Sequence, residues 1–161
     1  MKALSYVAKS YPKTKIIATT IGPDSQRFVN DLAYNNVFNA KLFGHIPQKK
    51  VFSIFKIPKI ICIDQFGEQP TGFSGLFRES VIHGVPLISD HNQFNLIGEK
   101  EELIHYHARS IKEINTRIDE IMKLSVEDYL NKRIEICKTT HNIYESINYG
   151  KYFKESFQAR E

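Results

Sequence analysis

The sequence is poor in cysteine, and it contains no long hydrophobic run. Its two cysteines, Cys62 and Cys137, lie 75 positions apart. This spacing excludes a disulfide framework and a Cys-x-x-Cys metal site, and it favours a reducing compartment. No segment approaches the run of about 18 apolar residues that a membrane-spanning helix needs, and the N-terminus lacks the order of a signal peptide. We therefore expect a soluble, cytoplasmic protein without a transmembrane segment.

A concentrated basic stripe is also lacking. Twenty-two Lys and Arg residues against eighteen Asp and Glu residues give a net charge of +4. This mild excess suits a phosphate-bearing ligand, whereas a dedicated nucleic-acid binder carries a clustered basic surface. The 161 residues, 42% apolar and 25% charged, are typical of a globular protein and long enough for one well-buried domain. We expect a single domain over residues 1–161, and we do not expect nucleic acid as its partner.

Helical and strand patterns alternate along the chain. The β-branched run KIIATTI before Gly22-Pro23 predicts a strand over residues 15–21, and the apolar run KIICID predicts a strand over 59–64 that is covered on both faces. The other expected helices cover residues 2–11, a stretch capped by Asp24 or Ser25 and running to about 34, 48–56 (with Pro47 at its first position), 75–83, 110–124, 125–147 and 149–157, and the other expected strands cover 40–43, 86–89 and 103–106. This order predicts an α/β fold with a Rossmann-like, doubly wound parallel sheet, closed by C-terminal helices from about residue 110.

The stretch from residue 71 to 89, TGFSGLFRESVIHGVPLIS, contains the most distinctive chemistry. A glycine-rich turn leads into a short amphipathic helix with one acid, Glu79, and a Gly-Val-Pro break precedes a buried strand. The backbone N–H groups at such a helix N-terminus stabilise an anionic ligand group. In doubly wound sheets, ligands bind at the carboxyl ends of the strands, so the loops after Ile21, Phe43, Asp64 and Ser89 are expected to share one edge with this helix start.

These loops resemble the donor-binding C-terminal domain of retaining glycosyltransferases of the GT-B fold. That family carries a Glu, seven residues, Glu pattern, followed by G-x-P-V-I. Here TGFSGLFRES and the following HGVPLIS match this spacing, with Glu79 on the second acid and Thr71 on the first. KIIATTIGP resembles the family's strand ending in a Gly-Pro turn, and KLFGHIP resembles its Phe-Leu-Gly-x-Val-Pro segment. The resemblance covers roughly residues 1–125.

The resemblance implies a site for the sugar donor. Glu79 would accept hydrogen bonds from the ribose hydroxyls, and Ile46 would lie against the nucleobase. Thr71 would stand at the sugar end with a hydroxyl and no charge. The remaining implied contacts come from backbone groups, with Gly72, Phe73 and Ser74 toward the sugar, Gly75 and Leu76 toward the diphosphate, and Gly22 in the Gly-Pro turn. No catalytic residue, metal or cofactor is implied beyond the donor substrate itself.

The implied function is that of half an enzyme. The chain would bind a nucleotide diphosphate sugar and transfer its sugar to an acceptor once an N-terminal acceptor domain, absent here, or a partner chain completes the cleft. We expect the isolated chain to be inactive. Two alternatives remain: a non-catalytic nucleotide-sugar-binding or regulatory protein derived from such an enzyme, and a Rossmann-like module for another nucleotide.

Several other residues keep two interpretations. Glu79 and His83, four positions apart, are either a metal pair or a surface and packing pair, and the alternating His105 and His107 are either half a metal site or hydrogen-bonded histidines. Lys49, Lys50 and Arg78 are either phosphate contacts or ordinary surface charges. The late segment NIYESINYGKYFKESF mixes aromatic residues with lysines, as single-stranded nucleic-acid binders do, but a helix packing across the domain explains it more simply.

Overall fold

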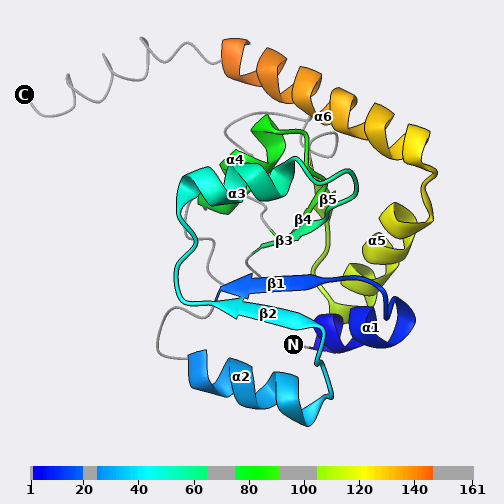
Figure 1. Cartoon of the computed structure of the whole chain (residues 1–161). Helices are drawn as coiled ribbons and strands as arrows, with labels where there is room; N and C mark the ends of the chain where they lie inside the picture. Colours follow the sequence, from blue (N-terminus) through cyan, green and yellow to red (C-terminus); the bar gives the residue numbers. More distant parts are fainter. Residues whose placement is uncertain (1, 20–24, 65–74, 91–104, 147–161) are drawn as a thin grey trace, which may run out of the picture.

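The structure is a computed structural model that describes residues 2–19, 25–64, 75–90 and 105–146, and it is α/β (Figure 1). The predicted helix over 149–157 and the site residues Gly22, Thr71, Gly72, Phe73 and Ser74 lie outside these ranges. In chain order the described elements are α1 (Lys2–Ser10), β1 (Ile16–Thr19), α2 (Ser25–Tyr34), β2 (Ala40–Phe43), α3 (Gln48–Phe55), β3 (Cys62–Ile63), α4 (Gly75–Ile82), β4 (Leu87–Ser89), β5 (Tyr106–His107), α5 (Ile111–Lys123) and α6 (Val126–Ser146).

All strand pairings among the described residues are parallel, as the alternation of helices and strands predicts. One sheet has the order β1-β2, with Ile16 beside Ala40, and the other has the order β3-β4-β5. Figure 1 shows β1 on the side of its sheet that faces β3. The described residues form no backbone ladder between β1 and β3, so the parallel α/β class is confirmed while a single continuous sheet is not.

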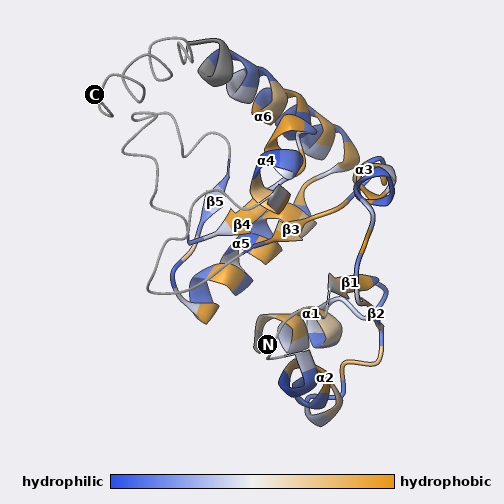
Figure 2. Cartoon of the chain, turned by 90° about the vertical axis from the view of Figure 1, so that its left-hand side faces the viewer, coloured by the Kyte–Doolittle hydropathy of each residue, from blue (hydrophilic) through white to orange (hydrophobic). Residues whose placement is uncertain are grey.

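The three-stranded sheet is covered on both faces, and neighbouring residues of β4 point to opposite sides. Leu87 belongs to a core cluster with residues from three helices, which are Phe55 of α3, Phe77 and Val81 of α4, and Ile136 of α6. Ile88 belongs to a second cluster that contains Ile114, Ile118 and Ile121 of α5. Figure 2 shows the hydrophobic strands β3 and β4 between α5 and the α4–α6 side. Parallel strands with both faces buried are expected to be apolar throughout, and β4 is fully buried.

The predicted strand over residues 59–64 is shorter in the structure, where β3 covers only Cys62–Ile63. Tyr129 of α6 explains the difference. Its hydroxyl accepts a hydrogen bond from the Ile60 N–H at 2.9 Å and donates to the Ile60 carbonyl oxygen at 2.5 Å. These backbone groups are therefore satisfied by a side chain from a distant helix instead of a neighbouring strand. The alternating burial is nevertheless as expected, because Cys62 packs in one cluster and Ile63 against the other.

Helix boundaries follow the local signals closely. Ser110 accepts from the Glu113 N–H while the Glu113 carboxylate accepts from the Ser110 N–H, which is a complete capping box for α5. At the start of α6, the Ser125 hydroxyl likewise accepts from the Asp128 N–H at 3.0 Å and donates to the Asp128 carboxylate at 2.6 Å. The position of Pro47 was predicted wrongly: it is the cap residue before α3, with φ −57° and ψ 141°, because its extended ψ does not continue into the helix.

Helix α6 crosses the C-terminal ends of α3 and α4 at very close range. The Arg133 guanidinium donates to the carbonyl oxygens of Phe55 at 2.8 Å and His83 at 3.0 Å, so one cation satisfies the ends of two helices. Gly84 has a φ of +65°, and a Cβ on it would overlap the Arg133 carbonyl oxygen and lie 2.8 Å from Sγ of Cys137. This crossing therefore requires glycine for both its backbone conformation and its lack of a side chain.

Helices α1 and α5 are joined by two tyrosines that share one carboxylate. The hydroxyl of Tyr6 lies 2.8 Å from Asp119, and the hydroxyl of Tyr11 lies 2.7 Å from it. These hydrogen bonds lower the pKa of Asp119, while the same carboxylate raises the pKa of Tyr11 to about 12. The contact links the N-terminal helix to the helix that covers one face of the three-stranded sheet.

None of the helices in the described ranges has the length and apolar character to cross a membrane.

Candidate functional site

The loop after β2 and helix α4 meet through one side-chain hydrogen bond. Gln48, the first residue of α3, donates from Nε2 to Oε1 of Glu79 at 2.9 Å. Ile46 lies two residues before Gln48 and is half-buried. The structure thus brings the segment that contains Ile46 close to Glu79, although the two residues are 33 positions apart in the sequence. Ile46 and Glu79 are both predicted site residues, and they belong to separate motifs of the sequence.

Helix α4 supplies the other described part of the predicted site. It begins at Gly75, which is exposed, and a Cβ there would meet nothing within 4 Å. The Leu76 side chain packs against the core cluster around Phe77, so its position in the helix start is fixed by apolar contacts. The first N–H groups of an α-helix have no partner within the helix, and Glu79 lies about one turn after them. The helix therefore presents backbone donors and a carboxylate close together.

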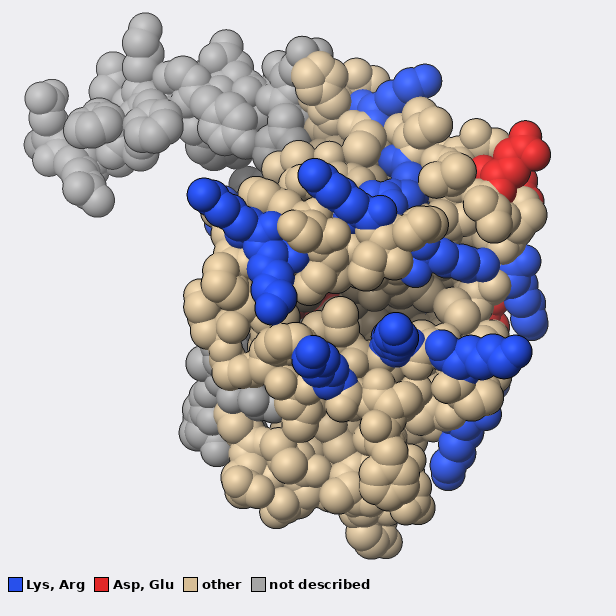
Figure 3. Space-filling model, viewed as in Figure 1, with Lys and Arg blue, Asp and Glu red and all other residues tan. Residues whose placement is uncertain are grey.

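Two lysines flank the aromatic ring at the end of β2. Nζ of Lys41 lies 5.4 Å from the centroid of the Phe43 ring, and Nζ of Lys50 lies 5.2 Å from it, both within the range of a cation–π contact. Figure 3 shows Lys and Arg side chains around a hollow in this face of the molecule. Lys50, one of the two lysines that the sequence offers as phosphate contacts, is thus held beside the loop that contains Ile46. Lys49 is exposed, and so is Arg78 of α4.

His83 packs against aromatic side chains at the end of α4. Its Nδ1 lies 2.8 Å from the backbone carbonyl oxygen of Glu79, and its ring stacks on Phe52 with centroids 4.7 Å apart. These contacts favour the packing interpretation over a metal pair with the Glu79 carboxylate. A search of the described residues finds no group of three His, Cys, Asp or Glu side chains that could hold a metal ion.

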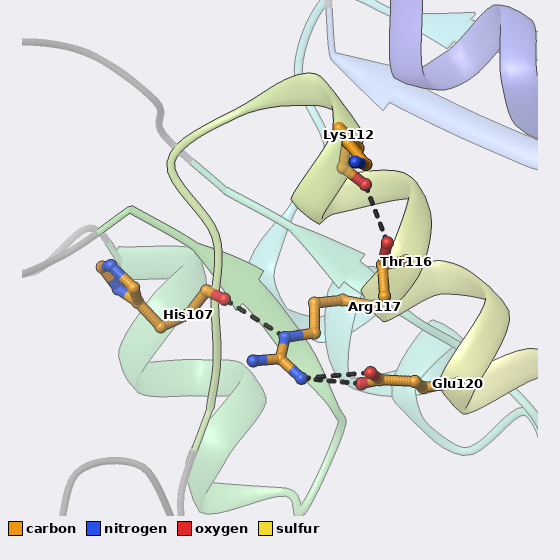
Figure 4. Close-up of polar contacts among 5 residues, drawn as sticks. All are labelled: His107, Lys112, Thr116, Arg117 and Glu120. Atoms are coloured by element: carbon orange, nitrogen blue, oxygen red, sulfur yellow. Dashed lines mark hydrogen bonds and ion pairs between the residues drawn. The ribbon is translucent and has the colours of Figure 1, made fainter.

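The two histidines around β5 have different surroundings. His105 is buried with its ring at 5.6 Å from that of Phe77 in an edge contact, and His107 is half-buried, with the two histidine rings 6.2 Å apart. The backbone carbonyl oxygen of His107 accepts from Nε of Arg117 at 3.3 Å, and Figure 4 shows the His107 ring pointing away from that arginine. Arg117 also pairs with Glu120 at 2.9 Å. These contacts attach α5 to the end of β5.

Sequence reasoning missed Gln48 and the role of Phe43. The signal for Gln48 is its polar side chain at the first position of a helix that follows a loop at a strand's carboxyl end. Nothing in the local pattern shows that α3 and α4 are neighbours, however, because that depends on how the strands pair.

Comparison of the chain with known protein families, curated proteins and solved structures finds no match. The resemblance to the glycosyltransferases therefore rests on the residues of its three motifs.

Proposed function

We propose that this chain is the nucleotide-sugar-binding half of a glycosyltransferase of the GT-B type. The observation that supports the proposal is the hydrogen bond between Glu79 and Gln48, the residue that directly follows the KLFGHIP motif, which brings the ends of two of the three motifs together. In the resembling family, the corresponding loop contacts the nucleobase and the corresponding acid contacts the ribose. An N-terminal domain or a partner chain would provide the acceptor site.

Glu79 suits the proposed role because a ribose presents two neighbouring hydroxyls. A carboxylate has two oxygens with about four acceptor positions, and Gln48 takes one position on Oε1. The Gln48 amide holds the carboxylate in one orientation while leaving acceptor capacity for the ribose. Gln48 is in this sense a positioning residue for Glu79.

The diphosphate would lie at the start of α4. The N–H groups of Gly75 and Leu76 would donate to it, and the helix dipole favours negative charge at this end. Lys50, held against Phe43, adds positive charge on the neighbouring segment. In sugar transfer the diphosphate leaves with increased negative charge, so fixed donors of this kind stabilise the transition state more than the bound donor.

A non-catalytic binding or regulatory protein is the second candidate, and Thr71 is the observation that favours it. In the resembling family an acid at this position approaches the donor sugar, whereas threonine brings no charge. The two functions differ in one measurement, since only the enzyme would transfer or hydrolyse the donor when a matching N-terminal domain is supplied. A module for another nucleotide would instead bind that nucleotide and no nucleotide sugar.

Calorimetric titration with UDP-, GDP- and ADP-sugars tests the proposal. We expect one donor class to bind weakly. Glu79→Ala should reduce the affinity by about 10- to 100-fold, because hydrogen bonds to a charged group contribute roughly 1.5–3 kcal/mol. Gln48→Ala should have a smaller effect of about 3-fold, since it removes only the orientation of the carboxylate.

Glu120→Ala is the matched control, because it removes an exposed glutamate of α5 far from α4 in the sequence and should leave the donor affinity unchanged. Circular dichroism establishes that each variant is folded. If no nucleotide sugar binds to the folded wild-type chain, or if Glu79→Ala binds as tightly as the wild type, the donor site is not where we place it.

A further inference from the structure

Helix α6 carries an exposed apolar stripe. Val126, Leu130 and Ile134 are 68%, 45% and 52% exposed, and they recur every four residues along one side of the helix. The side of α6 that contains Tyr129 and Ile136 is buried in the domain, so the stripe is additional to the packing face. A single exposed apolar residue needs no explanation, but three in register on one helix indicate an interaction surface.

Exposed apolar residues also lie at the ends of two helices that contact α6. Arg133 reaches the carbonyl oxygen of Ile57 after α3, and Sγ of Cys137 lies 3.3 Å from the carbonyl oxygen of Ile82 at the end of α4. The side chains of Ile57 and Ile82 are 44% and 54% exposed. Exposed apolar side chains are therefore also present at the helix ends that α6 contacts.

Charged residues beside the stripe are arranged so that the surface complements itself. Glu127 and Lys138 are both exposed and eleven positions apart, which is close to three helical turns, so they lie on the same flank of the stripe. Their midpoint is next to Lys132, and the midpoint of Leu130 and Ile134 is at Lys132 as well. A two-fold axis at that point would pair two copies of α6 in antiparallel orientation. Glu127 of each copy would then lie opposite Lys138 of the other, with Leu130 of each copy against Ile134 of the other between them and Val126 at the edge of the contact.

We propose that this surface binds a second copy of the chain through antiparallel pairing of α6. The helix has 21 residues, a length of about 31 Å, which is enough for several turns of contact. The two symmetric ion pairs fix the register and orientation, as charged flanking residues do in coiled coils. The dimer does not depend on the proposed nucleotide-sugar site.

A charge reversal tests this arrangement. Glu127→Lys and Lys138→Glu should each place two like-charged pairs across the interface and weaken dimerisation by at least about 10-fold. An equimolar mixture of the two variants should form a heterodimer of wild-type affinity, because every pair is then opposite in charge. Sedimentation equilibrium of the full chain measures the dissociation constants, and circular dichroism confirms folding.

Two further variants make the test decisive. Leu130→Asp should abolish the dimer without loss of helix, since Leu130 is exposed in the monomer. Glu135→Lys, which makes the same charge change on the far side of α6 from the stripe, should leave dimerisation unchanged. A wild-type chain that stays monomeric at all accessible concentrations would overturn the proposal and leave the stripe to a different partner. A dimer that tolerates both single reversals, or a mixture that fails to pair, would overturn it as well.

Discussion

The two sheets of this protein differ in how deeply their strands are buried. In β1, Ile16 is buried while Ile17 and Thr19 are exposed, and β2 has no fully buried residue. In β4, all three residues are buried, and helices cover both faces of the strand. Among the described strands, the three-stranded sheet therefore contributes more buried residues than the two-stranded sheet. The two-stranded sheet leaves much of its surface available for other contacts.

The N-terminal and C-terminal parts of the chain also differ in net charge. Residues 1–64 contain ten basic and three acidic residues, a net charge of +7, whereas residues 65–161 have a net charge of −3. Between residues 32 and 63 there are five lysines and no acid. The basic charge thus accompanies the less buried strands, where like charges cost little because water solvates them. The excess of positive charge therefore lies in the part that contains Lys41 and Lys50, whereas α4 belongs to the part with a net negative charge.

Gly84→Ala is the change that should break the C-terminal packing most severely. An alanine at this left-handed position costs about 1–2 kcal/mol in the backbone, and its methyl group would push α6 away from α4. We expect the free energy of unfolding to fall by about 4 kcal/mol, measured by urea denaturation.

Gly44→Ala is the matched control in the N-terminal part. A Cβ there would meet nothing within 4 Å, so we expect a change within about 0.5 kcal/mol. A Gly84→Ala variant as stable as Gly44→Ala would contradict the close crossing of α4 and α6.

Isoleucine truncation on the two sheets compares their burial directly. Ile88→Ala removes a side chain of β4 with no exposed surface, and we expect it to cost about 3 kcal/mol through lost burial and a residual cavity. Ile17→Ala removes a β1 side chain that is 41% exposed, and we expect a cost below about 1 kcal/mol. Urea denaturation of both variants measures the difference. Equal costs would mean that the two sheets are packed alike.

Local signals explain how much of the fold could be predicted from the sequence. The strand over 40–43 and the helices near 110–124 and 125–147 were predicted correctly, because apolar periodicity and turn residues act within a few positions. The start of β3 was not, since β3 covers only Cys62–Ile63 of the predicted 59–64 strand, while residues 103 and 104 of the predicted 103–106 strand lie outside the described ranges. Long-range contacts such as Tyr129 to Ile60 decide where β3 starts, and no local pattern contains them.

The candidate site was predictable only in its parts. The local pattern predicts the short helix that carries Glu79 and the loop that contains Ile46, and the resemblance to the glycosyltransferases singles out Ile46 in that loop. Their contact through Gln48 depends on the relative placement of α3 and α4, which the pairing of distant strands determines. Glu79 at the site remains a prediction until a ligand is tested, and the residues from 71 to 74 lie outside the described ranges.

Asp119→Asn should have a smaller effect than Gly84→Ala or Ile88→Ala, and it tests whether α1 and α5 stabilise each other. Tyr6 and Tyr11 donate to this carboxylate and lower its pKa below the ordinary value of 3.8, so the folded protein binds the proton less tightly than the unfolded chain. The stabilisation is therefore fully present above about pH 5 and is lost as the pH falls through the lowered pKa. Because solvent screens this half-exposed group, we expect Asp119→Asn to cost about 1 kcal/mol at pH 7. Urea denaturation at several pH values should show the difference from wild type shrinking toward zero below the ordinary pKa. A difference that stays constant down to pH 2 would mean that the ionised carboxylate does not hold α1 to α5.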